Sequence, residues 1–298
     1  MDKLEMLLGD AGAILADGAM GTMLISAGLK QGEPPQLWNL NHPQEVAQVH
    51  RQYLEAGSKL LLTNTFGANR FRMASHDSKA LIKELNHAGA KILRSVVDAK
   101  GGDTIVAGDI GPSGLMMAPY GELSFEEAKD GFNEQAAALI DGGIDVVWIE
   151  TMADLEEVRA AFEAVREVSG EIPILTTMTF DTQGRTMMGV SPEQAVRTLH
   201  AMGATAIGGN CGKGPQEIIS AIDEMHRSLP ETILVAKPNA GIPEVIDGIT
   251  VYNADPPTMA ECALQAYAAG ARIIGACCGS TPAHIQAMAE TLSLGNKD

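Results

Sequence analysis

Short apolar segments alternate with longer amphipathic segments along the whole chain. The short ones are rich in Val, Ile and Leu, and the long ones place apolar residues at helical spacing. This alternation predicts repeated strand–helix units around a parallel sheet. Eight strands are predicted, at residues 13–16, 59–63, 104–108, 145–149, 172–177, 204–208, 232–236 and 271–275. The predicted helices lie between or after these strands, at residues 43–56, 78–99, 124–141, 154–168, 192–202, 215–229, 256–269 and 282–292.

Glycines close several of these units just before the next strand, where a left-handed helix cap is expected. They are Gly57, Gly142 with Gly143, Gly203 and Gly270. Eight units without a break in composition predict a single α/β domain over residues 1–298, folded as a closed (β/α)8 TIM-type barrel. A doubly wound open sheet is the alternative, and it is disfavoured because open sheets usually have fewer units.

The composition limits the cellular location and the binding partners that we expect for this chain. Hydrophobic residues make up 45% and charged residues 20% of the chain, as in ordinary soluble proteins. No apolar run approaches the roughly 20 residues of a membrane-spanning helix, and the acidic start differs from a signal peptide, so we expect a cytoplasmic protein without membrane contact. The formal net charge of −17 would repel a phosphate backbone, which excludes nucleic acid as an expected partner.

Three of the four cysteines follow predicted strands. Cys211 comes after the sixth strand, and Cys277 and Cys278 come after the eighth. The carboxyl ends of barrel strands share one rim, so three thiolates can converge there on one ion; three sulfurs suit zinc and leave its fourth position open, as in catalytic sites. The alternatives are inert core cysteines or a redox pair at Cys277 and Cys278. Cys262 lies within a predicted helix at core spacing and is expected to be inert.

Charged residues occupy the same predicted rim. Asp17 and Glu150 follow the first and fourth strands, where two carboxylates can hold a cationic amino group, and Gly18 lets a ligand approach the backbone. Helix capping or loop bonding is the alternative for both carboxylates. Lys237 follows the seventh strand, and the sequence leaves its role open between a catalytic amine and a turn anchored by an ion pair.

These strand-end motifs, taken together, resemble the homocysteine S-methyltransferase family, which includes betaine-homocysteine methyltransferase and the homocysteine-binding module of cobalamin-dependent methionine synthase. The resemblance covers nearly the whole chain. Its motifs are Asp17-Gly18-Ala19-Met20-Gly21-Thr22, Thr63-Asn64-Thr65-Phe66, Gly108-Asp109-Ile110-Gly111-Pro112, Glu150-Thr151, Asn210-Cys211, Lys237-Pro238-Asn239-Ala240-Gly241 and Gly275-Ala276-Cys277-Cys278-Gly279.

The resemblance implies a (β/α)8 barrel with Zn²⁺ on Cys211, Cys277 and Cys278 and no catalytic residue beyond the metal site. It also implies an amino-acid pocket with substrate-binding residues Asp17, Gly18, Thr65, Phe66 and Glu150. Methionine synthase continues into folate, cobalamin and activation modules, whereas this sequence ends at residue 298. The methyl donor is therefore expected from outside, as a small methylated compound or a separate corrinoid or folate protein.

The expected reaction is methyl transfer to the thiol of homocysteine, giving methionine. A free thiol has a pKa of about 8.5 and is mostly protonated at neutral pH, so coordination to zinc would supply the thiolate. Two alternatives remain open: a homocysteine-binding subunit of a split methionine synthase, and a methyltransferase for a related thiol. A zinc hydrolase is disfavoured, because three thiolates make zinc a poor Lewis acid and no base lies beside the cysteines. The sequence leaves the donor, the acceptor thiol and the oligomeric state open.

Overall fold

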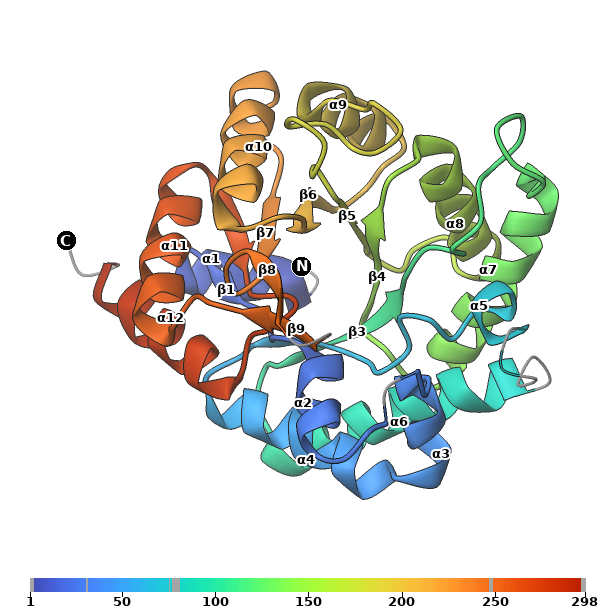
Figure 1. The fold of residues 1–298 in the computed structure, drawn as a ribbon, viewed down its shortest axis with the longest axis horizontal. Coiled ribbons are helices and arrows are strands. Elements are labelled where there is room, and N and C mark those ends of the chain that lie inside the picture. The colour runs from blue at the N-terminus through green and yellow to red at the C-terminus, as the bar shows by residue number, and fades with distance from the viewer. Residues whose placement is uncertain (1–2, 31, 75, 77–80, 247–248, 296–298) are drawn as a thin grey trace.

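Eight parallel strands form the centre of the molecule in the computed structural model, which describes residues 3–30, 32–74, 76, 81–246 and 249–295 (Figure 1). Their order in the sheet is β1-β10-β7-β6-β5-β4-β3-β2. The strands are β1 (Ile14–Leu15), β2 (Leu60–Leu62), β3 (Ile105–Ile110), β4 (Val146–Met152), β5 (Ile174–Met178), β6 (Ala206–Cys211), β7 (Leu234–Pro238) and β10 (Ala271–Ile274).

The first and second strands close the sheet on itself. Ala16 pairs in parallel with Leu60 just beyond the end of β1. The backbone amide of Asp17 donates to the carbonyl of Leu60 at 3.0 Å, and the amide of Lys59 donates to the carbonyl of Leu15 at 2.8 Å. The predicted (β/α)8 barrel is therefore confirmed, and an open doubly wound sheet is excluded.

Helices surround the strands, and a continuous apolar layer fills the space between the two (Figure 1). Their first turns carry the expected start signals; Ser124 and Glu127, for example, form a reciprocal capping box at the start of α7. The outer helices are α4 (Pro43–Glu55), α6 (Ile82–Lys100), α7 (Phe125–Asp141), α8 (Leu155–Val168), α9 (Pro192–Ala201), α10 (Pro215–Ser228), α11 (Pro256–Ala268) and α12 (Pro282–Gly295).

A second apolar cluster fills the barrel interior, and helix α1 (Lys3–Ala11) covers its amino-terminal end. Leu4 of this helix is 1% exposed and belongs to the same cluster as Trp148 of strand β4. Lys3 donates to the carbonyl of Thr104, just ahead of β3, at 2.6 Å. With this end covered, the barrel's opening lies at the carboxyl ends of the strands.

All eight strands and all eight outer helices match predicted elements. The prediction for residues 78–80, at the start of the second helix, lies outside the described residues. Strands β4 and β6 extend further than predicted, so Glu150 lies within β4 and Cys211 is the last residue of β6, rather than both lying in the following loops. Of the five predicted cap glycines, four have positive φ and Gly142 does not, because Gly143 takes the left-handed position instead.

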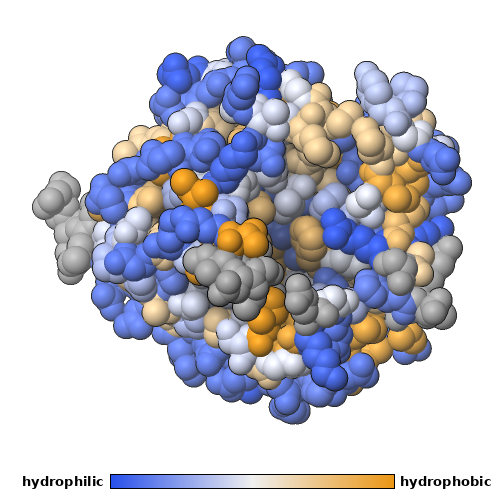
Figure 2. Space-filling view, viewed as in Figure 1, coloured by the Kyte–Doolittle hydropathy of each residue, from blue (hydrophilic) through white to orange (hydrophobic). Residues whose placement is uncertain are grey.

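Additional short elements lie among the loops that follow the strands, and the sequence pattern did not predict them. They are α2 (Met20–Ser26), η1 (Pro35–Leu37), α3 (Trp38–Asn41), α5 (Arg70–Ala74), and the antiparallel hairpin of β8 (Pro243–Ile246) and β9 (Ile249–Tyr252). Figure 2 shows the face on which they gather, with a hollow at its centre. Among the described residues, no helix is both long and apolar enough to cross a membrane.

Candidate metal centre and substrate pocket

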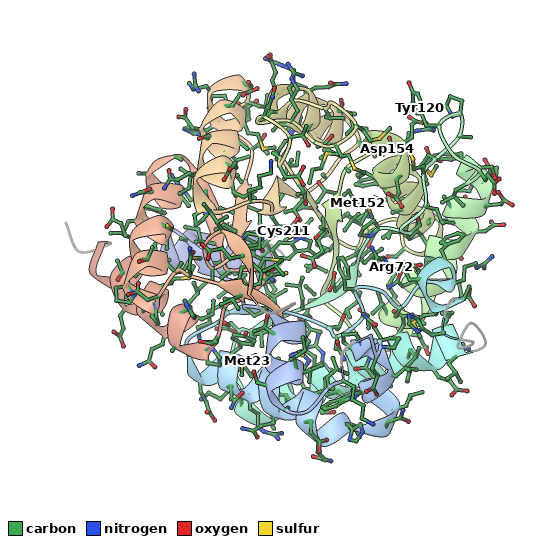
Figure 3. All side chains as sticks on the ribbon, in the orientation of Figure 1. Met23, Arg72, Tyr120, Met152, Asp154 and Cys211 are labelled. Atoms are coloured by element: carbon green, nitrogen blue, oxygen red, sulfur yellow. The ribbon has the colours of Figure 1, made fainter. Side chains whose placement is uncertain are left out.

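Three cysteines meet at the carboxyl end of the barrel. Cys211 is the last residue of β6, and Cys277 and Cys278 lie in the loop between β10 and α12. Their sulfur atoms all lie within 4.8 Å of one another, and all three residues are half-buried. Cys211 lies over the centre of the barrel in Figure 3. The predicted convergence is present in the structure, while the role of these residues as metal ligands stays a prediction.

The backbone leaves regular strand geometry to bring these sulfurs together. Cys211 has φ of +62°, a left-handed conformation that is uncommon for any residue with a side chain. Strand β10 ends at Ile274, so the two adjacent cysteines are not forced onto opposite faces of a strand. Gly279 has φ of +80°, and a Cβ placed there would lie 2.2 Å from the ring of Tyr252. Glycine is therefore required at the turn that follows Cys278.

The donor set fits a thiophilic metal ion. Hydrogen bonding with Cys277, together with burial, raises the pKa of Cys211 to about 12. Without a metal the cluster therefore holds protonated thiols, and a bound ion would displace their protons. Asn239 lies beside Cys211, and its buried Oδ1 has no hydrogen-bond partner among the described residues, whereas its amide donates to Gly212 O at 2.6 Å. An unsatisfied oxygen beside three sulfurs is the environment that a cation would complete.

A pocket of about 240 Å³ opens beside the cysteines. All five residues that were predicted to bind substrate line it, and so do the three cysteines. The cavity is therefore lined both by three sulfurs and by buried carboxylates. The five residues are Asp17, Gly18, Thr65, Phe66 and Glu150.

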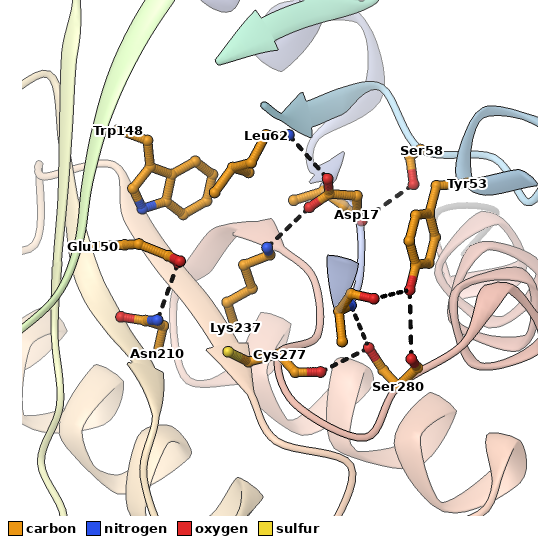
Figure 4. Close-up of polar contacts among 12 residues, drawn as sticks. Asp17, Tyr53, Ser58, Leu62, Trp148, Glu150, Asn210, Lys237, Cys277 and Ser280 are labelled. Carbon is orange, nitrogen blue, oxygen red and sulfur yellow. Dashed lines mark hydrogen bonds and ion pairs between the residues drawn. The ribbon is translucent and has the colours of Figure 1, made fainter. Parts of the chain in front are cut away.

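Asp17 and Lys237 form an ion pair in the wall of this pocket (Figure 4). The Lys237 Nζ lies 2.9 Å from the Asp17 Oδ1, and the two side chains are 5% and 4% exposed. Burial lowers the pKa of Lys237, but the charges of Asp17 and Glu150 outweigh it and hold that pKa above its usual value. Lys237 is thus a charged partner of Asp17, which favours the ion-pair alternative over a catalytic amine.

Asn210 holds Glu150 in place. Its Nδ2 donates to Glu150 Oε2 at 3.1 Å (Figure 4). The same Nδ2 donates to Thr151 Oγ1 at 2.7 Å. Burial raises the pKa of Glu150, and the charge of Lys237 opposes that rise. Neither the Asp17 nor the Glu150 carboxylate caps a helix, so the capping alternative does not account for them.

The loop that follows β1 is hydrogen-bonded to the cysteine loop. The amide of Ala19 donates to Ser280 Oγ at 3.0 Å, and Ser280 Oγ donates to the carbonyl of Cys277 at 2.8 Å. Tyr53 Oη donates to the carbonyl of Ala19 at 3.0 Å. A Cβ on Gly18 would lie 2.6 Å from Ser280 Oγ, so only glycine fits between these groups. The loop that carries the cysteines and the loop that follows β1 are therefore held together as one unit.

Thr65 and Phe66 have different roles in the lining of the pocket. The Thr65 hydroxyl is fully buried and donates to the carbonyl of Asp109 at 2.7 Å, so it stabilises the wall. Phe66 is half-buried in the pocket lining and has the Arg72 guanidinium 5.3 Å from its ring centroid. Cys262 is 7% exposed within α11, as expected for a core residue away from the site.

Residues 14–292 match the family described as homocysteine S-methyltransferase. The chain belongs to this family.

Relatives and solved structures agree with that membership. Methionine synthases of Mycobacterium leprae and Mycobacterium tuberculosis are each 31% identical, over 95% and 94% of this chain respectively. The chain spans about a quarter of the length of these relatives, 24% in both cases. The metallated form of the homocysteine methyltransferase MmuM from Escherichia coli superposes with a TM-score of 0.82 at 25% identity, covering 97% of this chain and 99% of that one.

Several residues that line the pocket or contact its lining escaped the sequence prediction. Asp109 and Asn210 stand within the quoted motifs, so their position next to strand ends was the available signal. Asn239 lies two residues after Lys237, in another of these motifs. Tyr252 had no such signal, because it lies on the unpredicted hairpin, where its hydroxyl is hydrogen-bonded to Cys278.

Proposed function

We propose that the protein transfers a methyl group to the thiol of homocysteine, with zinc held by Cys211, Cys277 and Cys278. The observation that carries this proposal is a cavity lined both by three convergent sulfurs and by buried carboxylates. A thiol amino acid has a sulfur and an ammonium group that match these two features. Zinc, when bound, favours the thiolate form of the acceptor sulfur at neutral pH.

The chain's own residues position the substrate. Glu150 is buried and fixed by Asn210, so it can pair with the substrate ammonium without reorganising. Asp17 carries a second carboxylate, whose charge Lys237 already balances. The donor carbon needs a good leaving group, as in a sulfonium, a quaternary ammonium, a methylated folate or a methyl-corrinoid.

The experiment is a methylation assay of zinc-loaded protein with homocysteine and each of these donor classes. We expect methionine from at least one donor, and no methionine from a Cys277→Ala variant. A matched Cys262→Ala variant should keep full activity, because Cys262 lies in the core of α11. Zinc-loaded protein that binds no homocysteine by calorimetry would refute the proposal whatever the donor.

A second candidate is delivery of the bound thiol to a separate protein that carries the methyl group. Exposed large hydrophobic residues lie in the segments that follow β3, β5 and β7, and Figure 2 shows apolar patches on the face that carries the hollow. These loop residues are Leu115, Met116, Tyr120, Met187, Ile242, Val245 and Val251. Apolar patches of this kind favour contact with another protein. Turnover with methylcobalamin on a carrier protein, but with none of the small donors, would select this candidate over the first.

A further inference from the structure

Three carboxyl groups and one ammonium group share the wall of the pocket. Asp17, Asp109, Glu150 and Lys237 come from the ends of β1, β3, β4 and β7, and each is at most 7% exposed. All four line the cavity, and Lys237 is the only Lys or Arg among the described residues that do so. With every group ionised, three negative charges and one positive charge would leave the cluster with a net charge of −2.

The three carboxyl groups differ in the partners that can stabilise a negative charge on them. Asp17 pairs with Lys237, and its Oδ2 accepts from the backbone amide of Leu62 at 2.9 Å. Glu150 accepts from Asn210 at 3.1 Å. By contrast, the Oδ1 of Asp109 is buried without a hydrogen-bond partner in the described part of the chain. Asp109 is therefore the carboxyl group least able to carry a negative charge.

Electrostatics favours a proton on that group. A buried charge without compensation costs several kcal/mol, so a carboxyl group in this position keeps its proton instead. Burial, then the neighbouring charge of Glu150, holds the pKa of Asp109 well above its usual range, and the charge of Lys237 only partly opposes this. The charged groups that act on Asp109 are Asp17, Glu150 and Lys237, from three different strand ends.

We propose that Asp109 is a neutral carboxylic acid and that its neutrality limits the pocket to ligands with a single ammonium group. Asp17 and Lys237 then cancel, and Glu150 alone remains to pair with one cation. An ionised Asp109 would instead leave two negative charges, which suit a dication. Asp109 is thus a specificity-determining residue. The ligand half of this inference rests on the proposed function, while the protonation state does not.

Infrared spectroscopy of the ligand-free protein tests the protonation state directly. A protonated carboxyl group has a carbonyl band separate from the bands of carboxylates and amides. We expect this band at neutral pH in the unsubstituted protein and in Glu150→Gln, and a weaker band in Asp109→Asn. Burial also raises the pKa of Glu150 and Glu157, so the deciding quantity is the part of the band that belongs to Asp109. Aspartate labelled with ¹³C at the side-chain carboxyl should shift that part in the unsubstituted protein, so the test stands even if a variant fails to fold. A band of unchanged intensity in Asp109→Asn, or a band of which no part shifts with the label, would overturn the proposal.

Calorimetry tests the consequence for ligands. Asn preserves the shape and neutrality of a protonated Asp, so Asp109→Asn should bind homocysteine within about threefold of the unsubstituted protein. Glu150→Gln should bind it at least about tenfold more weakly, because the paired charge is lost. Loss of binding in Asp109→Asn as severe as in Glu150→Gln would contradict a neutral Asp109. If the unsubstituted protein bound no homocysteine, the proposed function would fail, and the infrared band would still decide the state of Asp109.

Discussion

Asn210 on strand β6 binds Thr151 on strand β4 through two hydrogen bonds that span the intervening strand β5. Its Nδ2 donates to Thr151 Oγ1 at 2.7 Å, and the backbone amide of Thr151 donates to its Oδ1 at 2.9 Å. Thr151 has φ of +60°, and Cys211, next to Asn210, has φ of +62°. Such backbone conformations cost free energy and persist only where the surroundings impose them. One amide side chain thus holds the strained ends of the strands that carry Glu150 and Cys211.

We expect Asn210→Ala to lower the free energy of unfolding by about 2–4 kcal/mol, because it leaves buried polar groups of Glu150 and Thr151 without partners. Metal affinity should fall as well, because the conformation of Cys211 loses its support. Urea unfolding and metal competition measure the two effects. Asn133→Ala is the matched control: the Asn133 amide makes only 3.4 Å contacts near the surface, so a loss below about 0.5 kcal/mol is expected. Equal losses in both variants would remove the special role of Asn210.

The metal content of cysteine variants gives a second prediction. One zinc per chain should be retained by the unsubstituted protein and by Cys262→Ala, whereas Cys211→Ala and Cys277→Ala should lose most of it, because two thiolates hold the ion poorly against competition. Elemental analysis after dialysis against a chelator decides the outcome. Undiminished zinc in both Cys211→Ala and Cys277→Ala would show that the metal is held elsewhere.

The sequence predicted the elements that repeat and the residue types that are rare. The eight strands followed from apolar periodicity, and Cys211, Cys277 and Cys278 were conspicuous because each stands within three residues of the end of a predicted strand. Contacts that form across the closed barrel could not be predicted from the sequence. The pairing of Lys237 with Asp17 joins residues 220 positions apart, and only the closed barrel brings them to 2.9 Å.

The hairpin after β7 was missed for another reason. Its strands are short, and β9 turns Tyr252 inward against Gly279 while Val245 and Val251 stay exposed. Such a segment has neither the long helical period nor the buried apolar run on which strand and helix predictions depend. Its place over the cysteine loop therefore became visible only in the structure.

Lys237→Met should be strongly destabilising, by about 3–5 kcal/mol, because it leaves Asp17 as a buried charge without its partner. Adding Asp17→Asn should restore part of that loss, since the double variant has no such charge. A double-mutant cycle by urea unfolding measures the coupling, which we expect to exceed about 1 kcal/mol. A coupling near zero, with activity lost in Lys237→Met alone, would favour the catalytic amine that the sequence left open.

His50 is a fully buried residue of α4, and it takes no part in the pocket. Neither of its ring nitrogens has a hydrogen-bond partner among the described residues. Burial, with a smaller contribution from the charge of Arg51, lowers the pKa of His50 to about 3. In the unfolded chain its pKa returns to about 6.5. Between these two values the unfolded state binds a proton that the folded state does not.

Stability must therefore rise with pH across that window and fall as the solution is acidified from about pH 6.5 toward pH 3, by up to about 1.4 kcal/mol per pH unit from this one group. His50→Met should remove this contribution and flatten the pH dependence of the free energy of unfolding. His200→Gln alters an exposed histidine and should leave the slope unchanged. Urea unfolding of the three proteins at several pH values between 4 and 6.5 compares the slopes. Parallel curves for His50→Met and the unsubstituted protein would mean that His50 gains a proton in the folded state, which requires a partner or water at its ring.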